Sequence, residues 1–494
     1  MMITKYKRGA GIALVLVLCA LPIVWLSGTT WGSTTDDLLP TLISIENWRL
    51  FFWGFSRFGT LVPLLAKPFT DMRSNLLFQN SIHAVSLIVF VYALSRVFYR
   101  NRTKSANRTL VFVLLVFLFS ITHLVYLELL ISGLPYAAPL GIFGLSLLIV
   151  NSNLKRIIIV PILIIFTAVS CWVNPLNGYY LAPLLLVFLS LKKFKNVFYE
   201  LTLSYLLVNF GIFFVILGLA NGETGGTVTP NFRPFQIYHW WILLFAIQGF
   251  LVLRAIIRRE FKKNQFSYLS FLLTWVSIFA LTSLRHIHNN GEATRYFITA
   301  AFVSMCITMK LLEELIFEIE FVQVRVTKFL DFFSKKRVLS ASVLALLLAN
   351  VLISQNLVSD FPLQQPQKKL MGEIFKSKSE PYRFASGDFW YAWTTKIYMD
   401  RPEDIFVTAW ESEFQYDTAT DSKKAIQSRL KDGDLGLCFG KVRTCEREIR
   451  TAAFRMYGAF KVEVKVTDSY LITKEPTLVH SLRLSITSKK SANF

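Results

Sequence analysis

The first 355 residues of the chain alternate long apolar runs with short polar segments. Each run has roughly 17 to 22 residues, which is enough for an α-helix to cross the ~30 Å hydrocarbon core of a bilayer. The pattern predicts a polytopic α-helical membrane protein with about eleven transmembrane helices in residues 1–355. The expected spans are 10–26, 76–97, 109–127, 131–150, 157–173, 177–191, 201–219, 239–256, 267–284, 296–314 and 338–355.

The first run can be interpreted in two ways, because the basic residues of KYKR precede it as they would precede a signal peptide. Its apolar stretch is longer than a usual signal-peptide core, and no small-residue cleavage site follows it. We therefore expect a retained transmembrane helix rather than a cleaved leader.

Residues 356–494 show a different pattern, with charges spread throughout and no apolar run long enough to span a membrane. Short apolar stretches at 404–410, 434–440 and 461–474 alternate with segments of helical periodicity. Strands interleaved with helices are typical of a small α/β domain. We expect such a domain at the C-terminus, large enough for its own core.

The charge of the chain indicates its topology. Lys and Arg total 53 against 32 Asp and Glu, a formal net charge of +21, which might suggest a nucleic-acid partner. The basic residues, however, gather in every second loop between the apolar runs. Cytoplasmic loops of membrane proteins are enriched in Lys and Arg, so this set of loops is expected to be cytoplasmic. We therefore expect a cytoplasmic N-terminus, and an odd number of spans then puts residues 356–494 on the outer side of the membrane. We expect no nucleic-acid partner. The basic loops are 5–8, 100–108, 155–156, 192–195, 254–263 and 310–337.

The cysteines divide along the same boundary. Cys19, Cys171 and Cys306 lie in or at the ends of apolar runs, whereas Cys438 and Cys445 lie in the exported region. An oxidising compartment permits a disulfide between the last two, and we expect one, with a free pair as the alternative. The spacing lacks the paired CxxC pattern of a structural zinc site, and we expect no metal.

Candidate chemistry begins in the outer loop 28–75, which follows the first span. Two adjacent carboxylates, Asp36 and Asp37, stand a few residues beyond the membrane helix. They are candidate catalytic groups at the membrane surface. The alternative is a solvated turn, or the N-cap of a helix that begins near Leu38.

The segment after the acid pair is apolar and aromatic, with Glu46, Arg49 and Arg57 as its candidate functional side chains. Glycine and proline interrupt it, which argues against a spanning helix and favours interfacial helices that lie along the bilayer. The planar guanidinium of either arginine matches the oxygens of a lipid phosphate. Arginines that only reach for the membrane interface are the alternative.

Two later outer loops add polar candidates. The turn at 172–180 contains Asn174 and Asn177. The alternative is that this turn only connects two helices. The loop at 283–297 is richer, and its arginines favour an anion such as a phosphate over a metal cation, with a plain polar loop as the alternative. The candidates in it are Arg285, His286, His288, Glu292 and Arg295.

The order of TTDDLL, ENWRLFFWGFSRFGTLVPLLAKPF, NPLNGYY and TRYF, followed by an exported domain, resembles the GT-C superfamily of membrane glycosyltransferases. The length and layout are similar to the serotype-converting O-antigen glucosyltransferases. The resemblance implies a polyprenyl-phosphate sugar donor, a catalytic base at Asp36 or Asp37, and donor-phosphate contacts from Arg57, Arg285 or Arg295. It implies no cofactor. The chain lacks a clear D-x-D and the WWDYG signature of the oligosaccharyltransferase branch.

These residues and the resemblance predict an inverting transferase at the outer membrane surface. Its substrates would be a polyprenyl-phosphate sugar, such as the glucose form, and a glycan acceptor such as O-antigen. Two alternatives remain open, a flippase for a lipid-linked saccharide and an O-antigen polymerase or ligase. A flippase tends to place charges inside its spans, and few occur here. Polymerases and ligases typically use a large outer loop between late helices, whereas the large exported region expected here is C-terminal.

Overall fold

A computed structural model describes part of the 494-residue chain. The described residues are 35–45, 48, 50–52, 55–98, 136–150, 152, 154–174, 239–257, 271–272, 275, 303, 305–306, 308, 382–388, 392, 405–409, 431–457, 460–472 and 477–488.

The chain forms two compact units, whose boundary falls inside one long helix. One unit comprises Met1–Trp25, Asn80–Ile131 and Pro135–Ile353, and the other comprises Leu26–Gln79, Ser132–Leu134 and Ser354–Phe494. The first unit therefore holds most of the expected spans, and the second joins the first outer loop with the C-terminal region.

Four described helices coincide with expected spans, namely α4 (Met72–Phe98), α7 (Ala137–Val150), α8 (Arg156–Val173) and α11 (His239–Ile257). Within the described ranges, the stretch Ser74–Val97 of α4 is long and apolar enough to cross a membrane, and Ala137–Val150, Ile157–Val173 and Phe245–Arg254 form shorter apolar helices. The other seven expected spans lie wholly or mostly outside the described residues.

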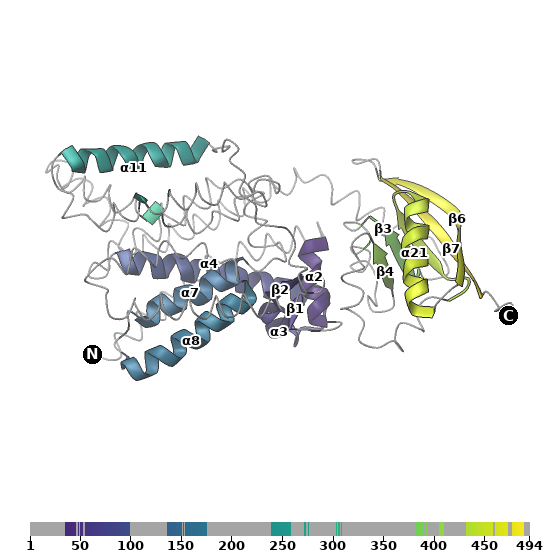
Figure 1. Cartoon of the computed structure of the whole chain (residues 1–494), viewed down its shortest axis with the longest axis horizontal. Coiled ribbons are helices and arrows are strands. Elements are labelled where there is room, and N and C mark those ends of the chain that lie inside the picture. The colour runs from purple at the N-terminus through teal and green to yellow at the C-terminus, as the bar shows by residue number, and fades with distance from the viewer. Residues whose placement is uncertain are drawn as a thin grey trace, which may run out of the picture. The chain divides into compact units, whose positions relative to one another are not determined.

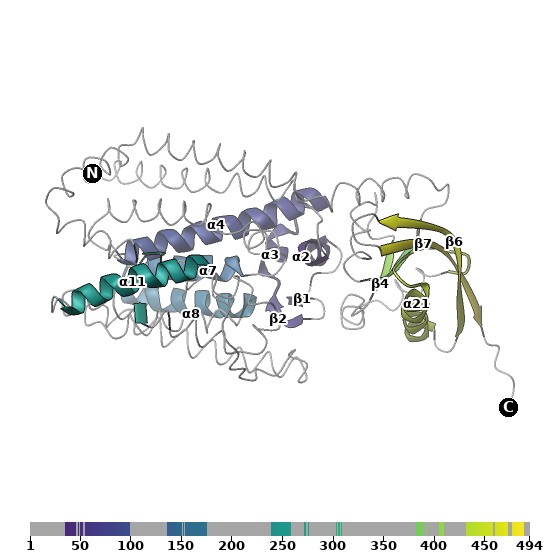
Figure 2. The same ribbon diagram turned by 90° about the horizontal axis from the view of Figure 1, so that it is seen from above.

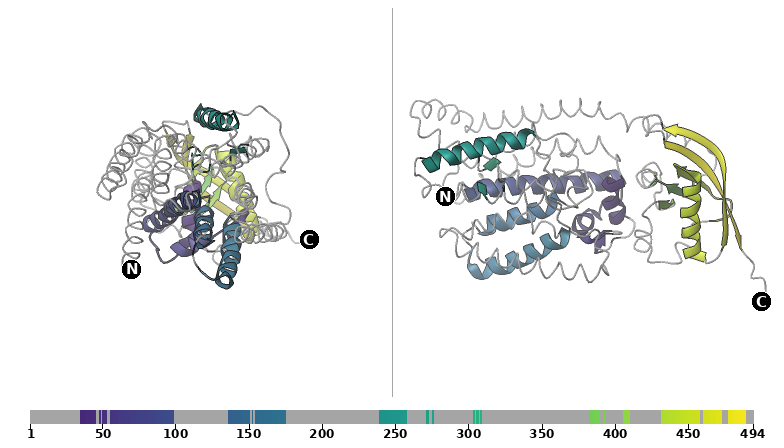
Figure 3. Two further views of the ribbon diagram at one scale, coloured as in Figure 1. Left: turned by 90° about the vertical axis from the view of Figure 1, so that its left-hand side faces the viewer. Right: turned by 45° about the horizontal axis from the view of Figure 1, so that its top comes forward.

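Small residues let α4 and α7 approach closely, and the two helices lie side by side (Figures 1 and 3). A Cβ atom placed on Gly141 would lie 2.5 Å from the Cβ of Ser86, and one on Gly144 would lie 2.8 Å from the Cα of Phe90. Close contact through small residues is the usual way in which membrane helices associate. Because both contact positions advance along the chain together, α4 and α7 run in the same direction.

Helix α8 returns beside α7, as Figure 2 shows. Ser170, near the end of α8, donates a 3.2 Å hydrogen bond to the carbonyl of Pro139, near the start of α7, so the pair is antiparallel. Two helices that cross a bilayer in the same direction need an odd number of crossings between them. The expected span 109–127 would supply one between α4 and α7.

A buried polar cluster centred on α11 links three segments of the first unit. The Nε2 of Gln248 donates to the Oγ1 of Thr308 at 2.8 Å, and the Nε1 of Trp275 donates to the Oε1 of Gln248 at 3.0 Å. Gln248 is completely buried. In an apolar setting such a side chain stabilises helix packing, because leaving its amide without partners costs free energy.

Replacing Gln248 with leucine is therefore expected to destabilise the packed helices by roughly 1 to 2 kcal/mol. The melting temperature of the purified full chain in detergent measures the effect. Ser95→Ala is the control, because the Ser95 hydroxyl donates to the Tyr92 carbonyl of its own helix. A Gln248→Leu protein that melts with the wild type would show that the cluster does not stabilise the fold.

The C-terminal region forms a five-stranded mixed sheet in the order β4-β3-β5-β7-β6. Strands β3 (Phe384–Gly387), β4 (Phe406–Ala409) and β5 (Leu435–Phe439) are parallel, and β6 (Phe460–Ile472) and β7 (Thr477–Ser488) form an antiparallel hairpin beside β5. The side chains of β3 and β5 are buried throughout, as expected for parallel strands that are covered on both faces.

Helix α21 (Val442–Tyr457) packs across this sheet, contacting β3, β4, β5 and β6. Cys445, Glu448 and Ile449 are buried, and their i, i+3, i+4 spacing defines the face turned to the sheet. Gly436 makes room within the sheet, because a Cβ atom there would lie 2.1 Å from the ring of its cross-strand neighbour Phe384. Together these contacts give the region its own core.

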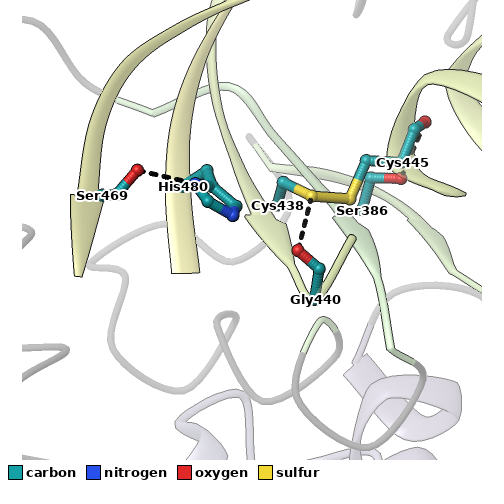
Figure 4. The surroundings of a disulfide bond; sticks show 6 residues. All are labelled: Ser386, Cys438, Gly440, Cys445, Ser469 and His480. Atoms are coloured by element: carbon teal, nitrogen blue, oxygen red, sulfur yellow. Dashed lines mark hydrogen bonds between the residues drawn. A yellow bond between two sulfur atoms is a disulfide. The ribbon is translucent and has the colours of Figure 1, made fainter. Parts of the chain in front are cut away.

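A disulfide ties α21 to the sheet (Figure 4). Cys438 of β5 is bonded to Cys445 of α21, seven residues later in the chain, with a Cα–Cα distance of 5.8 Å. The hydroxyl of Ser386 on β3 donates a 3.3 Å hydrogen bond to the backbone carbonyl of Cys445. Gly387 (φ +108°) lies against the same bridge, where a Cβ atom would approach both the Phe439 carbonyl and the Cys445 sulfur.

Removing the disulfide should destabilise the C-terminal region by about 2 to 3 kcal/mol, the value that chain entropy gives for such a short loop. The measurement is the rate at which a protease cleaves residues 382–488 of the full chain, with and without a reductant. Cys306→Ser is the control, because Cys306 is a free, buried cysteine. Equal cleavage of the wild type and a Cys438→Ser, Cys445→Ser protein would contradict the expectation.

Candidate functional site

The acid pair lies in the first turn of a helix. Helix α2 spans Thr35–Ile45, so Asp36 and Asp37 are inside it rather than in a turn before a helix at Leu38. Acidic residues in a first turn interact favourably with the positive end of the helix dipole. Pro40 lacks the N–H that would bond the carbonyl of Asp36. The acid pair therefore lies at the N-terminal end of a short helix.

The sides of α2 differ in chemistry. Positions 37, 41 and 44 follow the i, i+4, i+7 spacing of one helix face, where Thr41 and Ser44 are buried polar residues. Positions 36, 40 and 43 follow the adjacent face, which carries Pro40 and the buried Ile43. Helical spacing therefore places position 37, rather than position 36, on the polar side of α2.

A β-hairpin follows α2 where the sequence analysis expected interfacial helices. Strands β1 (Phe51–Phe52) and β2 (Phe55–Gly59) pair antiparallel, with Arg57 in β2. The aromatic residues of both strands favour an extended backbone. The indole of Trp48 donates a 3.2 Å hydrogen bond to the carbonyl of Thr60, which closes the base of the hairpin.

A short helix then leads into α4. Helix α3 (Leu61–Ala66) buries Val62, Pro63 and Ala66. Asp71 starts the next helix, because its Oδ2 accepts a 2.8 Å hydrogen bond from the Ser74 backbone N–H. A carboxylate in this capping position satisfies a backbone donor that has no partner within its helix. Asp71 therefore caps the N-terminus of α4, which begins at Met72.

Asn75, in the first turns of α4, joins the loop elements together. Its buried Nδ2 lies 2.8 Å from the Ser44 hydroxyl of α2, 2.9 Å from the Ala66 carbonyl of α3 and 2.8 Å from the Phe69 carbonyl. Its Oδ1 accepts a 2.6 Å bond from the Nε2 of Gln79. One side chain therefore holds the helix that carries the acid pair against the start of α4.

The next turns of α4 carry further buried polar groups. Gln79, Asn80 and His83 are 2%, 2% and 3% exposed. Within the described part of the chain, three of their atoms have no hydrogen-bond partner, namely the Oε1 of Gln79, the Nδ2 of Asn80 and the Nδ1 of His83. Buried polar atoms normally have a hydrogen-bond partner, so this face of α4 is unusual in presenting three that lack one.

The structure places few of the remaining sequence candidates. Asn174 ends α8 as its C-cap, is fully buried and bonds through its backbone N–H to the Ser170 carbonyl. Thr41, Ser44 and Asn75 were not among the residues predicted from the sequence. The candidates that lie outside the described residues are Glu46, Arg49, Asn177, Arg285, His286, His288, Glu292 and Arg295.

A signal for Asn75 is present in the sequence. FQNSIH interrupts an otherwise apolar span, and Asn75, Gln79 and His83 recur every four residues along one helix face. Among the described residues, no group of three or more His, Cys, Asp or Glu could hold a metal ion. The polar groups that the structure does bring together in this region are amides, hydroxyls and an imidazole.

No protein-family model matches the sequence, and no curated protein matches it. Among solved structures, the chain is similar to the crystal structure of ArnT from Cupriavidus metallidurans in the apo state, with a TM-score of 0.50 and 10% identity. The match covers 97% of this chain and 98% of ArnT. The chain has the fold of ArnT. That fold is the fold of a polytopic membrane protein. At 10% identity the similarity establishes the architecture alone, and the function has to be argued from the residues of the site.

Proposed function

We propose that the chain is a GT-C glycosyltransferase that takes a sugar from a polyprenyl-phosphate carrier. The observation that carries the proposal is the similarity to ArnT over 97% of the chain. ArnT is a GT-C glycosyltransferase, and the independent resemblance of the sequence motifs leads to the same superfamily. Helix α2, directly after the first expected span, supplies the acidic residues that such a reaction needs.

The finer proposal places transfer at the periplasmic face of a bacterial inner membrane, with glucose as the sugar and O-antigen as the acceptor. It supposes about eleven spans, a cytoplasmic N-terminus and a periplasmic domain at 356–494, which the alternation of basic loops supports. The parallel direction of α4 and α7 agrees with the same alternation.

The reaction needs one proton transfer and one displacement. A carboxylate of α2, for which we propose Asp37, accepts the proton of the acceptor hydroxyl. The hydroxyl oxygen bonds to the anomeric carbon while the bond from that carbon to the phosphate oxygen breaks. The electron pair leaves with the phosphate. Because attack comes from the face opposite the phosphate, the anomeric configuration inverts, and the products are a glycoside and the polyprenyl phosphate.

Arginines would stabilise the phosphate as its charge develops, because a guanidinium binds phosphate oxygens in pairs. Arg57 is the described candidate and lies on β2, in the hairpin that follows α2. Arg49, Arg285 and Arg295 are the remaining candidates, which the sequence motifs support. Glu46, Asn174, Asn177, His286, His288 and Glu292 complete the proposed substrate-binding set.

The test is a transfer assay with the purified full chain. Polyprenyl-phosphoglucose is supplied with lipopolysaccharide that bears O-antigen, followed by carriers of other sugars. The proposal expects labelled glycan and free polyprenyl phosphate in equal amounts, with the opposite anomeric configuration in the product. Failure to consume any carrier would contradict it. Movement of the intact carrier between leaflets, without consumption, would instead identify the flippase, and growth of the glycan by whole repeat units would identify the polymerase.

A further inference from the structure

The unsatisfied polar face of α4 is the feature that the proposed mechanism leaves unused. Gln79, Asn80 and His83 lie within five residues of one another, in a stretch whose length and apolarity suit a membrane span. All three are at least 97% buried. Polar side chains at such a place are costly and are by default functional.

Hydrogen bonds already determine how one of these side chains is oriented. The Nε2 of Gln79 donates to the Oδ1 of Asn75, so the Oε1 of Gln79 is the atom left over, and it can only accept. The unpartnered Nδ2 of Asn80 can only donate. The Nδ1 of His83 donates or accepts according to its tautomer. The face thus offers an acceptor, a donor and a group that can serve as either.

Such a mixture suits a neutral ligand with several hydroxyl groups, because each hydroxyl both donates and accepts a hydrogen bond. An anion would call for Arg or Lys, and the three side chains include neither. We propose that Gln79, Asn80 and His83 bind the hydroxyl groups of the sugar on the carrier. This inference rests on the proposed function and assigns that sugar a binding surface.

Helix α2 contributes a related observation. The buried Oγ1 of Thr41 also makes no hydrogen bond within the described residues. Thr41 is one turn after position 37 and one turn before Ser44, whose hydroxyl contacts Asn75. The helix with the proposed base therefore carries an unsatisfied hydroxyl on the face that is tied to α4.

The experiment compares two carriers on the full chain in nanodiscs, namely polyprenyl-phosphoglucose and bare polyprenyl phosphate. The wild type should bind the glucose carrier at least tenfold more tightly. Gln79→Leu, Asn80→Leu and His83→Phe should each reduce this preference about five- to fiftyfold and leave the affinity for the bare carrier unchanged. Ser95→Ala is the matched control on the same helix, because its hydroxyl is already bonded within α4.

A second measurement does not depend on the variants folding. Carriers of single deoxy-glucoses are titrated onto the wild type, and at least one should bind fivefold or more weakly than the glucose carrier. Equal binding of all deoxy carriers would overturn the inference, as would variants that keep the glucose preference. Variants that weaken both carriers equally would also overturn it, since the residues would then act on the carrier or the fold.

Failure of the proposed function gives a distinct result. If the wild type binds neither carrier and transfers no sugar, the proposed function falls and this inference falls with it. If the wild type transfers sugar and prefers the glucose carrier, but the α4 variants retain that preference, only the sugar-binding surface is lost.

Discussion

Asp37→Asn is expected to reduce the rate of sugar transfer by about 10²- to 10⁴-fold, the contribution of a well-placed general base. Asparagine keeps the size of the side chain but cannot take the proton of the acceptor hydroxyl. The affinity for the lipid-linked donor should remain within a few-fold of wild type. The measurement is the initial rate of transfer under saturating donor and acceptor.

Asp36→Asn is the matched control, because positions 36 and 37 are adjacent in the sequence but belong to different faces of α2. Position 37 shares its helix face with Thr41 and Ser44, whereas position 36 shares its face with Pro40 and Ile43. We expect Asp36→Asn to lose less than about tenfold. A reversed order of the two variants would move the base to Asp36, and full activity in both would remove the base from α2.

Asn75→Leu should be the most destabilising change in the loop region, by about 3 to 5 kcal/mol. It removes the Asn75 partner of the Phe69 carbonyl, the Ser44 hydroxyl and the Nε2 of Gln79. The Ala66 carbonyl also loses Asn75 but keeps its bond from the Phe69 backbone N–H. A buried polar group that loses its partner costs about 1 to 3 kcal/mol. The melting temperature of the purified chain in detergent should fall strongly.

The same substitution should impair transfer even where the protein still folds, because α2 loses its bond to α4. Asn75→Asp distinguishes the contacts, since it keeps an acceptor for Gln79 but loses the donor to Ser44, Ala66 and Phe69. Ser74→Ala is the control, because Ser74 is exposed and adjacent. An Asn75→Leu protein as stable and as active as the Ser74→Ala protein would show that Asn75 does not hold the loop together.

The sequence predicted the elements that have strong periodic signals. Helices α4, α7, α8 and α11 lie within a few residues of expected spans, since long apolar runs have few alternatives in a membrane protein. The stretches at 404–410, 434–440 and 461–474 contain strands β4, β5 and β6. A polytopic membrane fold was likewise predicted from the sequence, and the similarity to ArnT supports it.

The loop between the first spans was harder to predict. An apolar aromatic segment suits an interfacial helix and a short hairpin equally well, and the pairing of Phe51 with Gly59 is a contact that periodicity does not encode. Asn75 looked like the end of a loop, because its role depends on three acceptors up to 31 residues away in the chain. Tertiary contacts, rather than local preference, decide both features.

If the first outer loop carries the proposed catalytic base, sugar transfer takes place on the outer side of the membrane. The most direct measurement uses right-side-out and inside-out vesicles that contain the full chain and the lipid-linked donor, with a membrane-impermeant glycan acceptor outside. Product is expected in right-side-out vesicles, and Asp37→Asn should abolish it. Product in inside-out vesicles alone would place the acid pair on the cytoplasmic side and would rule out transfer at the outer face.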